Sequence, residues 1–376
     1  MKDIITDKLL SIDWDFKDSN TANLTHSLHP YHAKFIPQLP YILIKYLTRE
    51  YDSVLDPFCG SGTTLVEALR LKRRSVGVDN SPLSCLLSNV KTTKIQQKKL
   101  EAACMELLKR VKKGGEPIIP DFPDRDKWFT FKNLNDLGLI WKNIDYFKNQ
   151  DCDIYNFFRV VFSSILKTVA NYKYHWNWAF IGDNVLPDKE RKEIDVLKIF
   201  ERKLQKSKKM LINLNNIITP TTMSAKIFDL DARKISCNIP TQFDLMITSP
   251  PYPCAVDFNR YYRLTYYWFG WDVNRYRDME IGARSKRGKK DVIDKYKEEL
   301  VDCILEIYNV MKRNSYSCFV IGNTQRKKEK IDAVNLIKEI CKGAGFNFYI
   351  ELNRRISKQS MAQKRIAEEK IIIFTR

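Results

Sequence analysis

The chain has 376 residues, of which 44% are hydrophobic and 12% aromatic, so it can build a substantial core and is not disordered as a whole. Its 64 Lys and Arg outnumber 45 Asp and Glu, and the resulting net charge of +19 favours a polyanionic partner. No apolar run approaches the ~18 residues of a membrane span, no signal peptide is evident, and the nine cysteines include no CxxC pair, so the composition predicts an intracellular protein with reduced thiols.

Strand and helix alternate in the first part of the chain. A loop leads into a helix from about Pro37, strands are predicted at 52–58 and 74–79, and helices follow at 63–72 and 82–90. Residues 1–28 show little pattern. The alternation favours an α/β fold with an open, mainly parallel sheet.

Helical periodicity dominates residues 92–222, which we interpret as a mostly helical insertion between 1–91 and 223–376. The α/β pattern then resumes. We predict strands at 224–231, 243–249 and 316–323, helices at 259–271, 291–312 and 329–343, a basic loop at 273–290, and a closing antiparallel hairpin from 346–352 and 369–375. The first segment is nearly neutral, whereas the insertion and the last segment carry the positive excess.

The first motif follows the strand at 52–58 and opens a helix. It consists of Asp56, Pro57, Phe58, Cys59, Gly60, Ser61, Gly62, Thr63 and Thr64. Two glycines let the backbone turn sharply and approach a ligand, and the helix N-terminus offers free N–H groups to an anionic group. The next strand ends at Asp79, where a carboxylate can accept both ribose hydroxyls of an adenosine. The missing third glycine argues against a dinucleotide.

The second motif, Ser249-Pro250-Pro251-Tyr252, follows the apolar strand at 243–249. Strand C-termini of a parallel sheet share one edge, so this loop should face the first motif. The prolines fix the Ser249 hydroxyl and the Pro250 carbonyl, and Tyr252 offers a face on which a base can stack. Fixed acceptors that bind an exocyclic amino group would stabilise the positive charge that develops as the nitrogen is methylated.

The two motifs together resemble the amino-methyltransferases of DNA that use S-adenosylmethionine. The resemblance covers roughly 29–91 and 224–376 and implies a Rossmann-like methyltransferase fold, with the first loop binding the cofactor and the second catalytic. Ser249 resembles the cytosine-N4 members, whereas adenine-specific members usually carry Asp or Asn there. Matching the family's other motifs adds His32, Lys34, Phe35, Asn80, Asp231 and Ala232 to the predicted cofactor residues, with Asp229 as a second choice for the acid that reads the adenine.

The resemblance also implies double-stranded DNA as the substrate, a flipped target base, a cytoplasmic protein of a prokaryote or phage, and a restriction–modification system whose cognate endonuclease is a candidate partner. We expect no membrane association and no metal; the histidines at 26, 29 and 32 are spaced for metal binding, but Pro30 interrupts a helix there. The insertion at 92–222 is the candidate target-recognition region by elimination. Phosphate contacts are expected from Arg260, Arg263, Arg284, Lys286, Arg287, Lys289 and Lys290.

Three alternatives stay open. The nearest is adenine-N6 methylation on the same fold. Guanine-N2 methyltransferases of transfer RNA carry a similar glycine loop, but they usually have Asp in place of Ser249 and a separate N-terminal domain. A non-catalytic DNA-binding protein with a relict cofactor fold is the alternative of another class.

Overall fold

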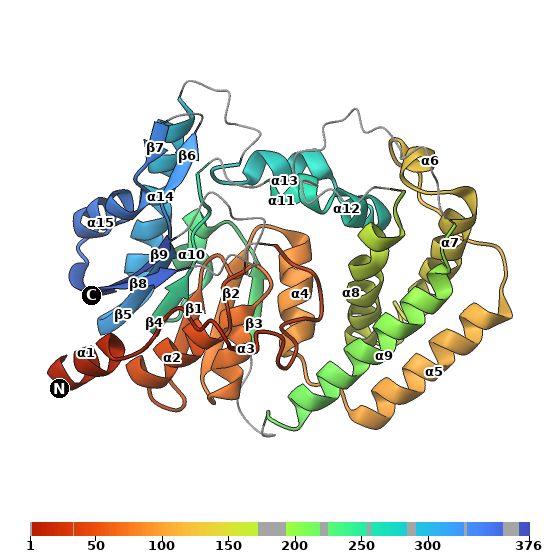
Figure 1. The fold of residues 1–376 in the computed structure, drawn as a ribbon, viewed down its shortest axis with the longest axis horizontal. Helices are drawn as coiled ribbons and strands as arrows, with labels where there is room; N and C mark the ends of the chain where they lie inside the picture. The colour runs from red at the N-terminus through yellow and green to blue at the C-terminus, as the bar shows by residue number, and fades with distance from the viewer. Residues whose placement is uncertain are drawn as a thin grey trace.

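The computed structural model describes residues 2–32, 34–171, 193–218, 225–253, 257–283, 291–326, 329–355 and 368–376. Figure 1 shows a sheet-bearing half on the left, which holds both termini, and a lobe of helices on the right. Within the described ranges, no helix combines the length and the apolar character needed to cross a bilayer.

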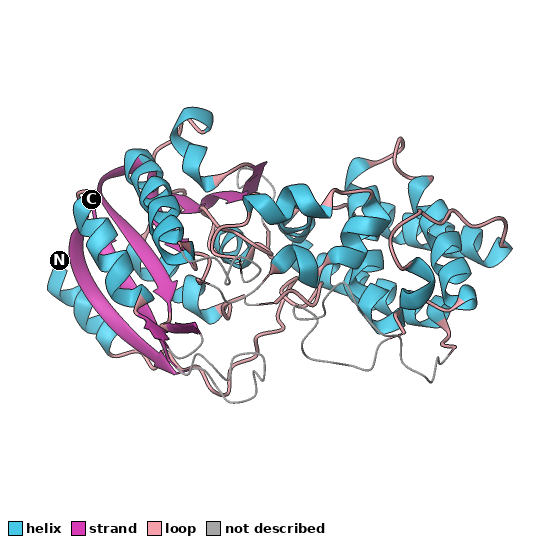
Figure 2. Ribbon diagram, turned by 90° about the horizontal axis from the view of Figure 1, so that it is seen from above, coloured by secondary structure: helices cyan, strands magenta, loops and turns pink. Residues whose placement is uncertain are grey.

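Seven strands of the described residues form one sheet (Figures 1 and 2). In spatial order they are β3 (Ala225–Asp229), β2 (Arg74–Asp79), β1 (Ser53–Asp56), β4 (Phe243–Thr248), β5 (Met311–Ile321), β9 (Glu368–Thr375) and β8 (Asn347–Arg355). The pairs among β1 to β5 are parallel, and β9 runs antiparallel to both of its neighbours. The predicted mainly parallel sheet with an antiparallel closing pair is therefore confirmed. A separate small pair is formed by β6 (Thr324–Arg326) and β7 (Glu329–Ile331).

Helices cover both faces of the sheet, and successive strand residues alternate between the two layers. On β1, Val54 joins the core with α1 (Lys2–Leu10), α2 (Gln38–Leu47) and α3 (Thr63–Arg70). Its neighbour Leu55 joins the opposite core, which contains α10 (Ile235–Asn238), α14 (Val292–Val310) and α15 (Ala333–Gly343). Because both faces are buried, the central strands are continuous apolar runs, which is why they could be recognised in the sequence.

The segment after α4 (Pro82–Thr92) builds most of the right-hand lobe in Figure 1. We call this part the helical lobe, and it consists of α5 (Gln97–Lys113), α6 (Arg125–Trp128), α7 (Phe131–Asp145), α8 (Cys152–Val169) and α9 (Val196–Asn215). Its apolar core is continuous with the outer side of α4, which itself packs on the sheet. The expected helical character of this segment is thus confirmed for its described residues.

Three short helices that follow the second motif connect the two halves along the top of Figure 1: α11 (Phe258–Tyr261), α12 (Arg263–Phe269) and α13 (Val273–Met279). The buried ring of Trp268 on α12 lies 5.2 Å from Phe162 of α8 and 6.4 Å from Phe129, measured between ring centroids. This aromatic packing attaches the chain that follows the second motif to the helical lobe.

Several element boundaries differ from the sequence-based expectation. The single helix predicted at 259–271 is interrupted at Tyr262, whose hydroxyl accepts a 2.7 Å hydrogen bond from the backbone N–H of His32. Residues 273–279, expected as loop, form α13, since Asp272 caps its N-terminus. The helix predicted from 329 begins only at Ala333, because residues 329–331 form β7, and α1 occupies part of a segment without sequence pattern. Residues 284–290 lie outside the described residues.

Candidate active site

The first motif lies where the strand order changes direction. Strands β2 and β3 lie on one side of β1, and β4 and β5 lie on the other, so the loops after β1 and β4 flank a topological switch point. Gly60 and Gly62 have φ angles of 50° and 77°, in the left-handed region that other residues rarely adopt. A Cβ on Gly62 would also lie 2.8 Å from Ser88 Oγ of α4, so glycine allows the close approach of this loop to α4.

Asp79, at the end of β2, holds the glycine loop in place. Its Oδ2 accepts from the Gly60 N–H at 2.9 Å and its Oδ1 from the Ser81 N–H at 2.9 Å. The Ser84 side chain adds a third hydrogen bond. Since a carboxylate can accept about four, Asp79 can still accept one from a ribose hydroxyl. Loss of hydration raises the pKa of Asp79 to about 6, although these hydrogen bonds oppose the rise.

The residues present fit an adenosine cofactor by a second observation. Within the described structure, Ser61 Oγ is buried and has no hydrogen-bond partner. An unpaired buried hydroxyl is unfavourable unless a ligand completes it, so its place in the loop favours a polar ligand there. Most of the motif is buried: Asp56, Pro57, Cys59, Ser61, Gly62, Thr63 and Thr64 are buried, while Phe58 and Gly60 are half-buried. Burial also raises the pKa of the Cys59 thiol well above its ordinary value, which keeps it unreactive.

Tyr31 is a site residue that the sequence-based list omitted. A Cβ on Gly60 would lie 3.2 Å from the Tyr31 ring, so the two residues are in close contact. The Tyr31 hydroxyl is 2.8 Å from Ser84 Oγ, and its ring stacks on Tyr262 at 5.3 Å. The signal was present, because Tyr31 stands inside the motif from which His32 was chosen, but only the fold places its ring against the glycine loop.

The other residues of that N-terminal motif are spread over several surroundings. The His32 ring lies 4.9 Å from the ring of Tyr261, and Lys34 Nζ donates to the carbonyl of His26. Phe35 packs with the α1 and α2 side of the sheet. Of the three histidines, His26 is 2.7 Å from Glu67 Oε1. No cluster of three or more His, Cys, Asp or Glu suited to a metal occurs in the described part of the chain.

The acids expected near the adenine differ in how they are engaged. Asp229, at the end of β3, is paired in register with Asp79. Asp231 caps the short turn that begins with the buried Ala232, and it forms an ion pair with Arg233 at 2.6 Å. Burial alone would raise the pKa of Asp231, but the hydrogen bonds from Arg233 hold it below its ordinary value. Asn80 donates from Nδ2 to the Met279 carbonyl at 3.1 Å and so ties β2 to α13. The assignment of Asp231, Ala232 and Asn80 to the cofactor stays a prediction.

The second motif lies directly beside the first, as the sequence predicted. Thr248, the last residue of β4, donates from Oγ1 to Asp56 Oδ1 at 2.8 Å across 192 residues of sequence. Burial raises the pKa of Asp56 to about 6. Ser249 follows Thr248 at once and is half-buried, while Pro250 is buried. The expected proximity of the two loops is therefore confirmed.

The backbone of the second motif is fixed at its third residue. The Tyr296 hydroxyl of α14 donates to the Pro251 carbonyl at 2.8 Å. In contrast, no hydrogen bond from a described residue occupies the Pro250 carbonyl. The Ser249 side chain is hydrogen-bonded to Tyr252 within the same loop. The loop thus holds the Ser249 hydroxyl and the Pro250 carbonyl in a rigid frame.

The Tyr252 side chain is anchored to strands β5 and β9, which follow β4 in the sheet. Its hydroxyl lies 3.1 Å from Glu369 Oε1 of β9 and 3.5 Å from the Val320 carbonyl of β5. Glu369 also forms an ion pair with Arg354 of β8. Both side chains are buried, with exposed fractions of 8% for Glu369 and 7% for Arg354. This chain of contacts from β8 to the second motif was invisible in the sequence, because Arg354 and Glu369 stand more than 100 residues after Tyr252.

Of the predicted phosphate-binding residues, the structure describes Arg260 and Arg263. Arg260 is half-buried on α11. Arg263 is only 7% exposed, and its guanidinium lies over the Trp128 ring at 5.5 Å from the centroid, a position that suits packing between α12 and α6. Arg284, Lys286, Arg287, Lys289 and Lys290 lie outside the described residues.

Comparisons with known proteins find similarity to DNA methyltransferases. A family model for N6 and N4 methyltransferases, described as DNA methylase, matches residues 5–89. The chain is 26% identical to type II methyltransferase M.MvaI of Kocuria varians over 95% of this chain and 89% of that protein. It is 32% identical to type II methyltransferase M.MjaII of Methanocaldococcus jannaschii, over 39% of this chain and 29% of the relative.

Among solved structures, a TehB-like SAM-dependent methyltransferase from Corynebacterium glutamicum matches 90% of this chain and 86% of that chain, with 7% identity and a TM-score of 0.34. The family model and the sequence relatives support a DNA methyltransferase of the class that methylates cytosine N4 or adenine N6, with S-adenosylmethionine as its cofactor.

Proposed function

We propose that this protein transfers a methyl group from S-adenosylmethionine to the N4 amino group of cytosine in DNA. The observation that carries the proposal is the position of Ser249, which follows Thr248 directly while Thr248 is bonded to Asp56 of the cofactor loop. A base that contacts Ser249 would therefore lie next to a cofactor held by the glycine loop.

The amino nitrogen of cytosine is a weak nucleophile, because its lone pair is delocalised into the ring. Hydrogen bonds from its two N–H groups to Ser249 Oγ and the Pro250 carbonyl would favour a tetrahedral nitrogen and stabilise its developing positive charge. The new N–C bond would form as the S–C bond breaks, which would leave S-adenosylhomocysteine, and the methylated nitrogen would then release one proton to water. No covalent link to the protein is needed, since the two reactants only have to be aligned.

The cofactor supplies an electrophilic methyl group on a sulfonium. Asp79 would accept a hydrogen bond from its ribose, Ser61 would donate or accept one hydrogen bond, and the loop at Gly60 and Gly62 would lie against it. The segment before this loop is proposed to cover the bound cofactor, through Tyr31, His32, Lys34 and Phe35. The acid at 231, or that at 229, would read the adenine.

The target cytosine has to leave the duplex, because its amino group is paired inside it. Tyr252 would then stack on the flipped base while Glu369 holds the hydroxyl of the ring. We assign target recognition to residues 92–222, whose described helices α5 to α9 form the helical lobe, since α12 connects that lobe to the end of the second motif.

Mass spectrometry of nucleosides from DNA incubated with the protein and S-adenosylmethionine tests this proposal. We expect N4-methylcytosine. N6-methyladenine would overturn the choice of base and leave the DNA methyltransferase intact, whereas methyl transfer to transfer RNA alone would overturn the substrate class. Absence of S-adenosylmethionine binding would overturn catalysis itself.

A further inference from the structure

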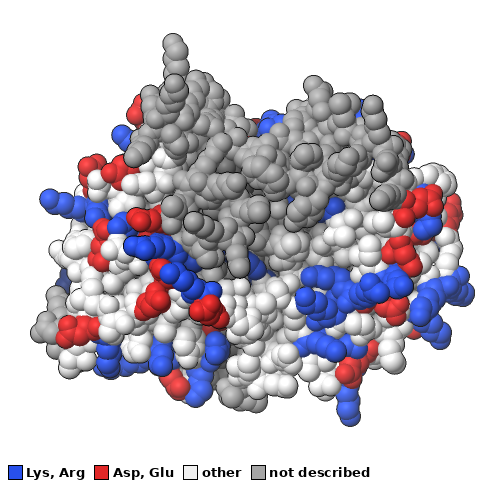
Figure 3. All heavy atoms as spheres, viewed as in Figure 1, with Lys and Arg blue, Asp and Glu red and all other residues white. Residues whose placement is uncertain are grey.

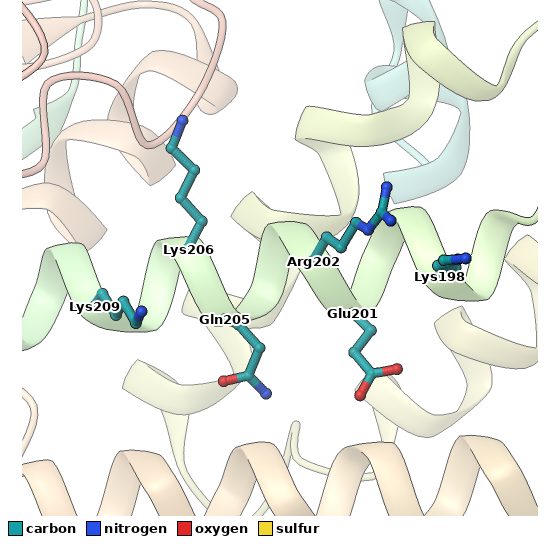
Figure 4. A pocket seen from close by; sticks show the side chains of 6 residues that line it. All are labelled: Lys198, Glu201, Arg202, Gln205, Lys206 and Lys209. Carbon is teal, nitrogen blue, oxygen red and sulfur yellow. The ribbon is translucent and has the colours of Figure 1, made fainter.

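The outer face of α9 carries a row of positive charge. Lys198, Arg202, Lys206 and Lys209 are all exposed and are spaced by three or four residues, so they project from one face of the helix. We call these four residues the α9 row. Together with Glu201 and Gln205 they line a shallow, open depression of about 530 Å³ (Figure 4). Figure 3 shows blue side chains gathered over this lower right part of the molecule.

The α9 row differs from an ordinary solvated helix face, on which opposite charges usually pair. Neighbouring helices of the lobe show that pairing: Arg110 bonds Glu106 on α5, and Lys132 bonds Asp136 on α7. Within the described part of the chain, no member of the α9 row makes an ion pair. Like charges at these spacings destabilise a helix, so an anionic partner would stabilise the row.

The C-terminal part of the row also approaches the junction of the two halves (Figure 1). In Figure 4, Arg202 and Lys206 extend to the side of α9 that faces away from α5, toward the junction, while Glu201 and Gln205 extend toward α5. Lys203, which lies between Arg202 and Lys206 in the sequence of α9, has a pKa lowered to about 8. Burial is the main cause, and the charges of Lys206 and Lys34 add to it. Lys34 belongs to the motif that precedes the cofactor loop, so the positive potential reaches from α9 to the sheet-bearing half.

We propose that the α9 row binds the phosphate backbone of DNA, independently of base sequence, and thereby orients the duplex on the junction between the helical lobe and the sheet. The four charges span 12 residues of helix, or about 16 Å, which is long enough to follow several consecutive phosphates. Exposed lysine and arginine heads that make no ion pair with another described residue are the groups that make such contacts. This inference rests on the proposed function, because it assumes that DNA is the substrate.

A variant with all four residues of the row replaced by glutamine tests the inference. Its affinity should fall by the same factor for duplexes that contain the target sequence and for duplexes that lack it. The slope of log K against log salt should become shallower by about 0.9 for each phosphate that the row neutralises in the wild-type protein. If each of the four side chains neutralises one phosphate, raising salt from 50 to 200 mM costs the wild-type protein about 150-fold more affinity than it costs the variant. The melting temperature should stay equal or rise, since repulsion along α9 is relieved.

The matched control replaces four exposed lysines of the sheet-bearing half, Lys45, Lys295, Lys297 and Lys342, by glutamine and so removes the same net charge. It should keep most of the affinity and slope. Equal losses of affinity in both variants would overturn the inference in favour of a net-charge effect. Unchanged DNA binding in the α9 variant would also overturn it, because the row would then contribute nothing to binding. Loss of transfer-RNA binding alone would assign the row to RNA. If the wild-type protein methylates no DNA, the proposed function fails; if it does and the α9 variant binds DNA normally, only this inference fails.

Discussion

The hydroxyl of Thr248 donates to the carboxylate of Asp56 at 2.8 Å, and both groups are buried. Asp56 begins the cofactor loop and Thr248 immediately precedes the catalytic loop. A short bond between the ends of two neighbouring parallel strands therefore sets the distance between the two loops. It also explains why a carboxylate in this position is tolerated, since hydrogen bonds offset part of its desolvation.

Replacing Thr248 by valine should lower both stability and turnover. The change removes one donor from a buried carboxylate, and an unmet buried group costs about 1–3 kcal/mol. Thermal melting and single-turnover methylation measure the two effects. Thr248→Ser keeps the hydroxyl and serves as the control; if valine and serine variants behaved alike, the bond would have no role in positioning the loops.

Ser249→Ala should reduce the rate of methyl transfer by about 100-fold or more, as removal of one preorganised hydrogen-bonding group does in other enzymes. Binding of S-adenosylmethionine should survive, because the glycine loop and Asp79 are untouched. Isothermal calorimetry and single-turnover kinetics separate the two properties. A folded variant unable to bind the cofactor would contradict the role given to Ser249.

The contact between Tyr252 and Glu369 predicts a separation of stability from turnover. Glu369→Leu alone should destabilise the fold by about 3–5 kcal/mol, because it leaves the Arg354 charge buried and unpaired. Adding Arg354→Met should restore most of that stability. Methylation should remain slow in the double variant, since the Tyr252 hydroxyl no longer has its acceptor on β9.

Tyr252→Phe is the matched comparison for this pair of changes, because it removes the hydroxyl without disturbing a charge. We expect it to share the kinetic defect of the double variant and to melt near the wild-type temperature. Full activity in the double variant would show that Glu369 serves only the fold.

Cofactor affinity should depend on pH through Asp79. Its pKa is raised from 3.8 to about 6, so the carboxylate that accepts a ribose hydroxyl is lost as pH falls through 6, and S-adenosylmethionine should bind more weakly at pH 5 than at pH 7.5. Calorimetric titrations between pH 5 and 8 measure this change. Asp79→Ala should bind weakly throughout, and a flat wild-type profile would exclude Asp79 as the acceptor.

The same shift has the opposite sign for folding. Because the folded protein holds this proton to higher pH than the unfolded chain does, the stabilising contribution of Asp79 is complete below about pH 4 and is lost as pH rises through 6. Asp56 behaves in the same way, since its pKa is also raised to about 6. The two carboxylates are therefore charged at neutral pH, and their ionisation lowers the free energy of unfolding there.

The sequence by itself determined the elements whose signals are local. The buried strands were recognisable as apolar runs because helices cover both faces of the sheet, and the glycines at 60 and 62 mark a backbone that other residues rarely adopt. The acid at Asp79 and the rigid loop at Ser249 also follow from residue types at fixed spacing. Even the meeting of the two loops could be predicted, since parallel strands end at one edge.

Only the tertiary structure decided which distant side chains complete the site. The stacking of Tyr31 on Tyr262 and the anchoring of Tyr252 by Glu369 join residues that are far apart in the chain, so no local pattern encodes them. Arg263 lies on a basic, aromatic segment that looked like a phosphate-binding surface, yet packing against Trp128 buries it. The physical reason is common to these cases: charge and aromaticity are properties of a residue, whereas exposure and partners are properties of the fold.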